Sequence, residues 1–264
     1  MPALSPGLPV GTPVWADLSS SDLDASTSFY GALLGWTRKD FPGDDADYAD
    51  FLSGGKAVGG LAAKVDEAPD AWDVYLKVDD IEATVMAAAA AGGRVLHEPS
   101  TVEGMGQWAL LEDPSGAEIA IWQAGPFAGF ELVDEPGAPC WFELHTTDFA
   151  AAVPFYEKVF GWKVTSIGDT DQFRMVVFGE QRTATAGIYD SARDGSRPGA
   201  APGSQWLVYL AVADADAAAS LVTANGGTVF DGPTDTPFGR MSHAADSTGA
   251  LFCFITLPDR TAAV

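Results

Sequence analysis

The chain has 264 residues, 47% of them hydrophobic, so it can fill a sizeable core and is not a disordered protein. Its formal net charge is -23, from 37 acidic and 14 basic residues. A surface this acidic repels phosphate backbones and anionic lipids, which argues against nucleic acids and membranes as partners. No segment reaches the roughly 20 apolar residues that span a bilayer, and the N-terminus lacks the basic and apolar regions of a secretory signal. We therefore expect a cytoplasmic protein.

An internal repeat covers most of the chain. VWADLSSSDLDASTSFYGALLGW begins at Val14 and aligns without a gap to CWFELHTTDFAAAVPFYEKVFGW, which begins at Cys140. The first matches are Trp15/Trp141, Leu18/Leu144, Asp22/Asp148, Phe29/Phe155, Tyr30/Tyr156, Gly35/Gly161 and Trp36/Trp162; later ones include Trp72/Trp206, Tyr75/Tyr209, Pro99/Pro233, Asp113/Asp246 and Gly116/Gly249. The offset grows between these blocks, which places an insertion in the Gly/Pro/Ser-rich segment 190–204 of the second copy. We expect this segment to be an exposed loop.

Each copy begins with a strand and a capped helix. The first strand, about 13–18 or 140–146, alternates with period two. Asp22 or Asp148 then suits a helix N-cap, and Gly35 or Gly161 suits the position after the helix C-terminus. Two short strands follow within 48–62 or 173–189.

The second half of each copy begins with a strand, 73–78 or 206–212. An Ala-rich helix follows, 81–93 or 215–227, and ends in glycines. Three strands complete the copy within 94–123 or 228–256, with the turn sequences DPSG and DSTG before the last. The Gly/Pro-rich segment 124–139 joins the copies as a linker. The sequence thus predicts two modules, 1–123 and 140–264, each made of two βαβββ units.

This pattern resembles the vicinal-oxygen-chelate superfamily, which contains glyoxalase I, bleomycin-resistance proteins and extradiol dioxygenases, and in particular its two-module actinobacterial glyoxalase-like subgroup. The resemblance rests on FYxxxLGW after the first strand and DPxG before the last, and it covers nearly the whole chain. It implies an α+β fold in which each module forms a curved half-barrel sheet with the ligand on its concave face. It also implies that a first strand of one module faces later strands of the other, so that the chain is a monomer with intrachain module pairing.

The resemblance also implies where a divalent metal would be bound. The first ligand of the family, usually His, aligns with Trp15 and Trp141; the last, usually Glu, aligns with Ala120 and Cys253; the middle one falls near Asp73 or Leu207. Neither set satisfies first-row metal coordination. We therefore predict no metal and no other cofactor. A relocated metal site formed by Glu143, His145 and His243 is the alternative, whereas His97 is expected in a solvated loop.

Strand alternation and the family's inward ligand position together place Trp15, Asp17 and Ser19 on one concave face and Trp141, Glu143 and His145 on the other. An indole beside a carboxylate can cover an apolar body and hold a hydroxyl, amide or cation. Equally, Asp17 and Glu143 can accept bonds from backbone or arginine and hold the module junction together; Arg240 is expected to pair with Asp17. Further ligand-binding candidates on the curved sheets are Asp73, Tyr75, Tyr209, Trp108, Trp122 and Phe238. The helix aromatics Phe29, Tyr30, Trp36, Phe155, Tyr156 and Trp162 are predicted to be core.

Three functions remain open at this point. The first is a metal-free small-molecule binding protein that sequesters a toxic or antibiotic-like ligand for detoxification or resistance. The second is a glyoxalase-like lyase or a dioxygenase or hydroxylase that uses a relocated metal or acid–base chemistry by Glu143 and His145. The third is a structural or signalling role. Because the two copies differ where ligand would lie, we expect two unequal pockets, with the Glu143/His145 pocket the functional one.

Overall fold

The computed structural model describes residues 7–41, 48–65, 68–193 and 203–258. Module 1 contains β1 (Pro13–Ser20), α1 (Leu23–Leu34), β2 (Thr37–Asp40), β3 (Tyr48–Ser53), β4 (Lys56–Ala63), β5 (Ala71–Val78), α2 (Ile81–Ala90), β6 (Arg94–Val102), β7 (Gly106–Glu112) and β8 (Glu118–Ala124). Module 2 contains β9 (Pro139–Thr146), α3 (Phe149–Phe160), β10 (Val164–Asp169), β11 (Arg174–Phe178), β12 (Ala186–Asp190), the 3-10 helix η1 (Ser191–Arg193), β13 (Gln205–Ala211), α4 (Ala215–Ala224), β14 (Thr228–Val229), β15 (Thr234–Thr236), β16 (Gly239–Ala245) and β17 (Leu251–Thr256).

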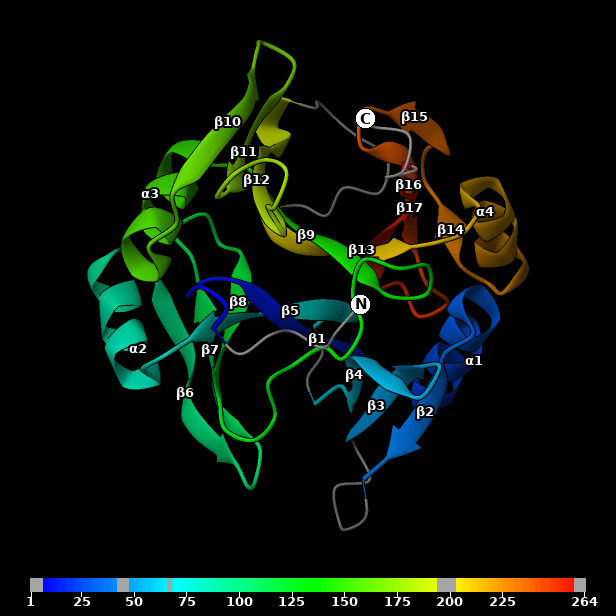
Figure 1. Cartoon of the computed structure of the whole chain (residues 1–264), viewed down its shortest axis with the longest axis horizontal. Coiled ribbons are helices and arrows are strands. Elements are labelled where there is room, and N and C mark those ends of the chain that lie inside the picture. Colours follow the sequence, from blue (N-terminus) through cyan, green and yellow to red (C-terminus); the bar gives the residue numbers. More distant parts are fainter. Residues whose placement is uncertain (1–6, 42–47, 66–67, 194–202, 259–264) are drawn as a thin grey trace.

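Each module forms one curved, mixed sheet, so the predicted α+β class is confirmed (Figure 1). The strand order is β2-β3-β4-β1-β5-β8-β7-β6 in module 1 and β10-β11-β12-β9-β13-β17-β16-β14 in module 2, with β15 beside β16. The expected placement of a first strand against the other module is wrong. β1 is hydrogen-bonded to β4 and β5 of its own module on its two sides, which leaves it no edge to offer. β9 is paired in the same way with β12 and β13.

The predicted helix ends are confirmed in the first helix of each module. Asp22 and Asp148 are the N-caps, and their carboxylates accept the backbone N–H groups of Ala25 and Ala151. Both helices end at a glycine in the left-handed conformation, with φ of 71° at Gly35 and 67° at Gly161.

Three strands were missed by the sequence analysis: β2, β10 and the three-residue β15. They lie at sheet edges and have no buried side chain, so they lack the apolar alternation that marks a strand in the sequence. The predicted exposed loop 190–204 begins with the end of β12 and η1, and residues 194–202 of that loop lie outside the described residues.

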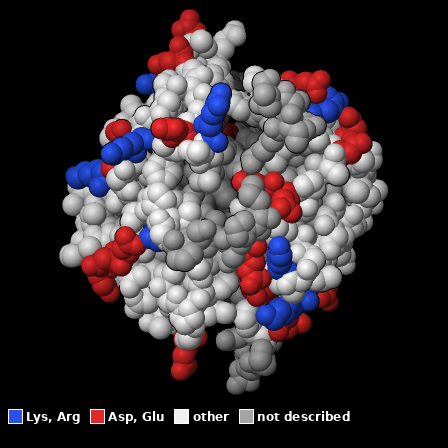
Figure 2. Space-filling view, viewed as in Figure 1, with Lys and Arg blue, Asp and Glu red and all other residues white. Residues whose placement is uncertain are grey.

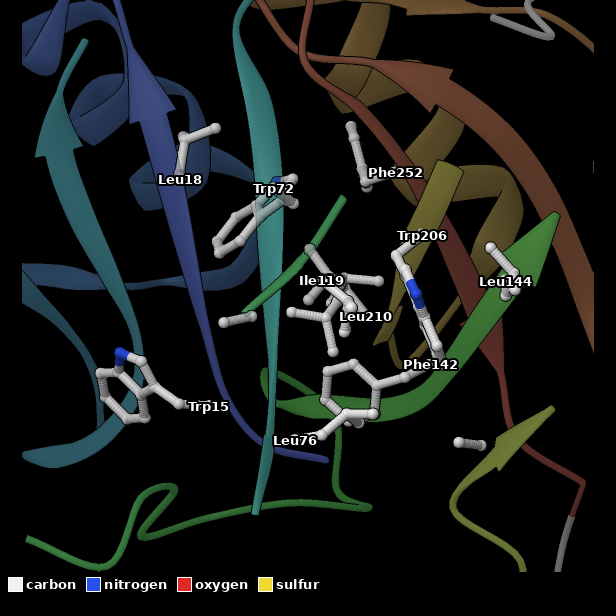
Figure 3. Packing of buried hydrophobic residues seen from close by; sticks show 14 of the residues in the cluster. Trp15, Leu18, Trp72, Leu76, Ile119, Phe142, Leu144, Trp206, Leu210 and Phe252 are labelled. Carbon is white, nitrogen blue, oxygen red and sulfur yellow. The ribbon is translucent and has the colours of Figure 1, made fainter. Parts of the chain in front are cut away.

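The modules pack with their helices in two pairs, α1 beside α4 and α2 beside α3, and with β5 and β13 at the centre (Figure 1). One apolar cluster runs through both modules, and Figure 3 shows Leu76 and Ile119 of module 1 beside Leu210 and Phe142 of module 2. The helix aromatics predicted to be core are buried, including Phe29, Tyr30, Trp36, Phe155, Tyr156 and Trp162. No helix of the described chain is long and apolar enough to cross a bilayer.

Candidate functional site

The concave face of each sheet, the side turned away from the helices of its own module, carries the predicted site residues of the first strands. In module 1 Leu18 lies opposite Trp72, whose indole N–H donates to Tyr30 on α1, so this side faces the helices. Trp15 and Asp17 alternate with Leu18 and therefore lie on the concave face. In module 2 Leu144 lies opposite Trp206, whose indole donates to Tyr156 on α3. Trp141, Glu143 and His145 alternate with Leu144 and therefore lie on the concave face.

In module 1 the Asp17 carboxylate is enclosed by aromatic donors. Its Oδ1 accepts from the Trp15 indole at 2.7 Å and from the Tyr48 hydroxyl at 2.8 Å, and Tyr75 donates to the same carboxylate. Burial raises the pKa of Asp17, although these three hydrogen bonds act to lower it. The proposed bonds from backbone or arginine are not what the structure shows, because the donors are indole and phenol groups of the same module.

A second carboxylate, Asp50 on β3, lies near this network. Burial raises its pKa to about 6; Lys39 lowers it in part, while the charges of Asp17 and Glu131 raise it further. Module 1 therefore places two buried acids, Asp17 and Asp50, near each other, and burial raises the pKa of both. Asp73 on β5 lies opposite Asp17 in the strand register, and its Oδ2 accepts from the Ser19 hydroxyl at 3.3 Å.

The segment that follows β8 covers Trp15 of module 1. Phe127 meets the indole edge to face at 4.9 Å between ring centroids, and Phe130 packs at 5.3 Å. The backbone N–H of Phe130 donates to Val14 O, and Glu131 N–H donates to Ala57 O, so the segment is tied to β1 and β4. As a result only 4% of Trp15 is exposed.

In module 2 the equivalent carboxylate, Glu143, is paired with an imidazole. Its Oε1 lies 2.7 Å from His145 Nε2 and accepts from the Tyr209 hydroxyl at 2.8 Å, while Oε2 accepts from the Trp141 indole at 3.0 Å. Burial raises the pKa of Glu143, but the hydrogen bond and charge of His145 and the bonds from Trp141 and Tyr209 outweigh it, so the pKa is lowered. This carboxylate is therefore held as an anion.

A second histidine–carboxylate pair faces the first. His243 Nδ1 on β16 lies 3.0 Å from Asp231 Oδ2, and its backbone N–H donates to Asp231 Oδ1 at 2.8 Å. The ring centroid of His243 is 6.0 Å from that of His145 and 6.5 Å from that of Tyr209. Glu143, His145 and His243 thus meet on one face, as the alternative prediction required, but each histidine is paired with its own carboxylate.

The strand register explains how His243 reaches this face. Trp141 on β9 lies opposite Tyr209 on β13, Tyr209 lies opposite Cys253 on β17, and Cys253 lies opposite His243 on β16. The corresponding row of module 1 is Trp15, Tyr75, Ala120 and Leu110. Module 2 therefore has a histidine where module 1 has leucine, and His145 where module 1 has Ser19.

The residues at the metal positions of the family do not fit a metal. These positions hold Trp15, Asp73 and Ala120 in module 1 and Trp141, Leu207 and Cys253 in module 2, which supply at most one carboxylate or one thiolate per site. In the part of the chain that the structure describes, no group of three or more His, Cys, Asp or Glu side chains is arranged to hold an ion.

The remaining predicted ligand residues are dispersed. Trp108 on β7 stacks on exposed His97 at 4.3 Å, and His97 lies in β6 rather than in a loop. Trp122 is buried, and its indole donates to Phe127 O. Phe238 is 43% exposed beside the turn between β15 and β16. The predicted pairing of Arg240 with Asp17 is wrong, because Arg240 is bonded to Asp216 and Asp235 near its own strand.

Sequence reasoning missed Tyr48 and Asp231. The repeat held a signal for Asp231: at the offset that aligns Pro99 with Pro233, Asp231 corresponds to His97, and one deletion later His243 corresponds to Leu110. His97 and Leu110 lie opposite each other in the β6–β7 register. The two modules therefore differ at a pair of neighbouring positions, which hold His97 and Leu110 in module 1 and Asp231 and His243 in module 2. No comparable signal marks Tyr48, since a tyrosine on an alternating strand is ordinary core material.

Comparison with known proteins supports the fold and places the chain in a family. The Glyoxalase/Bleomycin resistance protein/Dioxygenase superfamily matches residues 12–121 and 140–254. The chain is 35% identical to "Putative glyoxylase CFP32" of Mycobacterium tuberculosis, over 92% of this chain and 93% of the relative. It is 34% identical to "Anthracycline biosynthesis protein DnrV" of Streptomyces peucetius, over 94% of both chains.

Solved structures share the architecture at low identity. The Mn(II)-bound glyoxalase of Novosphingobium aromaticivorans superposes with a TM-score of 0.64 at 20% identity, covering 94% of this chain and 83% of that one. The 2,3-dioxygenase LapB of Pseudomonas superposes with a TM-score of 0.63 at 16% identity, covering 96% of both. The two family matches, the full-length relatives and the paired curved sheets lead to one conclusion: the chain belongs to the Glyoxalase/Bleomycin resistance protein/Dioxygenase superfamily.

Proposed function

We propose that this chain is a small-molecule-binding protein of the superfamily, that its ligand site is the concave face of module 2, and that it binds without the family metal. One observation carries the proposal: two histidine–carboxylate pairs, His145 with Glu143 and His243 with Asp231, lie together on this face. Imidazole nitrogens and carboxylate oxygens supply both donors and acceptors for the polar groups of an organic ligand.

Module 1 is the weaker candidate for two reasons. Its Trp15 is covered by the segment after β8. It also has Ser19 and Leu110 where module 2 has His145 and His243. In module 2, by contrast, Trp141 is partly exposed and lies beside the Glu143 anion.

The side chains of the module 2 face favour a neutral or cationic ligand with an aromatic or other flat apolar body. The indole of Trp141 and the ring of Tyr209 can cover such a body, and the two carboxylates attract positive charge. The net charge of -23 also favours a cationic ligand over an anionic one. On the face shown in Figure 2, Lys and Arg side chains lie close to acidic ones and form no continuous basic patch among the described residues. Sequestration of a toxic or antibiotic-like compound is the role this chemistry supports.

A thermal-shift screen tests the proposal, because a ligand that binds only the folded state raises the melting temperature. The probes are divalent metals, aldehyde–thiol adducts and cationic antibiotics. The matched variant is His145→Ser with His243→Leu, which gives module 2 the residues of module 1; Ser19→Ala is the control. We expect an organic probe to raise the melting temperature of the wild type and the control but not of the double variant. Stabilisation by metals alone, together with metal-dependent turnover, would contradict the proposal.

A second candidate is an acid–base enzyme that needs no metal. The 2.7 Å contact between Glu143 and His145 favours it, because a carboxylate can hold an imidazole in one tautomer and strengthen it as a base. The test is turnover of an aldehyde–thiol adduct in the presence of a chelator. Activity that survives the chelator and falls at least about 100-fold in His145→Ala would establish it. No turnover under these conditions leaves binding as the function.

A further inference from the structure

A tyrosine of each module reaches across the module boundary. The Tyr30 hydroxyl on α1 donates to Asp246 Oδ2 of module 2 at 3.1 Å and accepts from the Trp72 indole at 2.9 Å. Burial raises the pKa of Tyr30 well above its usual value, so the hydroxyl keeps the proton that it donates. Asp246 is 3% exposed. A buried chain of hydrogen bonds therefore runs from β5 through α1 into the other module.

An equivalent series of hydrogen bonds runs from module 2 into module 1. The Tyr156 hydroxyl on α3 donates to Asp113 Oδ2 of module 1 at 3.1 Å and accepts from the Trp206 indole at 2.9 Å. The aromatic neighbours follow the same symmetry. A Cβ at Gly227 would lie 2.8 Å from the Phe29 ring, and a Cβ at Gly93 would lie 2.8 Å from the Phe155 ring, so both helices seat against the opposite module at a glycine.

Asp246 and Asp113, which accept these tyrosine hydrogen bonds, each hold a hairpin turn. Asp246 Oδ1 accepts from the backbone N–H groups of Thr248, Gly249 and Ala250 and from the Thr248 hydroxyl. This turn joins β16 to β17 and so fixes the register of that hairpin. In that register His243 lies opposite Cys253, which lies beside Tyr209.

Tyr30 therefore contacts the end of the hairpin that carries His243 without touching the module 2 face itself. We propose that Tyr30 is a positioning residue for the module 2 site, acting through Asp246, and that Tyr156 does the same for the concave face of module 1 through Asp113. A single module is then an incomplete unit, because the aspartate that holds the turn of its hairpin lacks the tyrosine that bonds it from the other module. This inference rests on the proposed function only in naming the module 2 face as the ligand site.

The three histidines of the chain report on the two halves separately. His145 and His243 lie on the module 2 face. His97 of module 1 stacks on Trp108 of β7, the first strand of the hairpin that Asp113 holds. The matched variants are Tyr30→Phe and Tyr156→Phe, each of which removes one hydroxyl. The measurement is the chemical shift of the histidine ring protons in the ligand-free protein.

We expect Tyr30→Phe to move the His243 resonances and leave His97 in place, and Tyr156→Phe to do the reverse. A role in stability alone would lower the melting temperature of both variants without this crossed pattern, and that result would overturn the proposal. The proposal would also be overturned if each substitution moved the histidine resonances of its own module. Where a phenylalanine variant does not fold, Asp246→Asn and Asp113→Asn test the same link, because an asparagine oxygen can still hold the turn. As no ligand is present, failure here is separate from failure of the proposed function.

Discussion

Asp17 and Glu143 occupy the same place in the two modules, two residues after the repeated tryptophan, yet their environments act on them in opposite directions. Asp17 is bonded to neutral indole and phenol groups, so burial dominates and its pKa is raised. Glu143 gains His145 as a partner, and its pKa is lowered. A group whose pKa is raised on folding costs stability when ionised, whereas a carboxyl whose pKa is lowered contributes stability above its unfolded pKa.

The neutral amides should therefore behave differently in the two modules. We expect Glu143→Gln to lower the free energy of unfolding by about 2 kcal/mol at pH 7, because it leaves His145 without its charged partner. We expect Asp17→Asn to change it by about 1 kcal/mol or less, because the amide oxygen still accepts hydrogen bonds and the buried charge is gone. Urea unfolding of both variants at pH 7 measures the difference. Equal losses in the free energy of unfolding would show that the two carboxylates contribute equally to stability, which contradicts the prediction.

Asp50 gives a pH dependence of defined sign. Burial raises the pKa of Asp50 in the folded protein to about 6, above its ordinary value of 3.8, so the folded state binds the proton more tightly than the unfolded chain. Stability contributed by the protonated form is present below about pH 4 and is lost as the pH rises through about 6. We expect Asp50→Asn to be more stable than the wild type at pH 7, by about 1–3 kcal/mol, and equal to it near pH 3.5. Urea unfolding of both proteins across this pH range measures the difference in stability. A difference that does not change with pH would refute the prediction.

At the scale of elements, the concave face of module 1 depends on one strand position that carries no side chain. A Cβ at Gly60 on β4 would overlap Asp17 Oδ1 and the Tyr48 hydroxyl. β4 thus leaves the space in which these two side chains meet. In module 2 the equivalent Gly187 leaves space for Met175 and Trp141.

Gly60→Ala should therefore be destabilising even though alanine is tolerated in most strands. We expect a loss of about 2 kcal/mol, because the added methyl group displaces a buried, hydrogen-bonded carboxylate. Gly31→Ala on α1 is the control: its Cβ would have 3.4 Å to Trp36 O, and alanine favours the helix by up to about 1 kcal/mol. Thermal unfolding of both variants checks this, and a Gly60→Ala protein as stable as the control would contradict it.

The elements differ in how well the sequence foretold them. α1 and α3 followed from an aspartate before an amphipathic run and a glycine after it, because capping is local chemistry. β2 and β10 did not, because exposed edge strands are defined by the neighbour that pairs with them. Among site residues, Trp141, Glu143 and His145 share a face by alternation alone. Asp231 required the tertiary fold to bring it to His243 from a loop.

At the scale of the whole molecule, the two modules share one apolar cluster and two reciprocal tyrosine–aspartate bonds. We therefore expect a single unfolding transition for the described modules rather than two. Tryptophan fluorescence, far-UV circular dichroism and the separate loss of the His97 and His243 signals should coincide on one denaturant curve. A first transition that removes the signal of one module only would contradict this.

The sequence by itself determined the duplication, the family and the capped helices. Each of these follows from residue identity at fixed spacing, which a linear chain carries in full. Only the tertiary structure decided which strands pair, and it kept each concave face within one module because β1 and β9 are saturated on both sides by their own module. It also decided that His243 pairs with Asp231, and that a tyrosine of each module bonds the turn aspartate of the other, since these contacts depend on how the strands and the modules are placed in space.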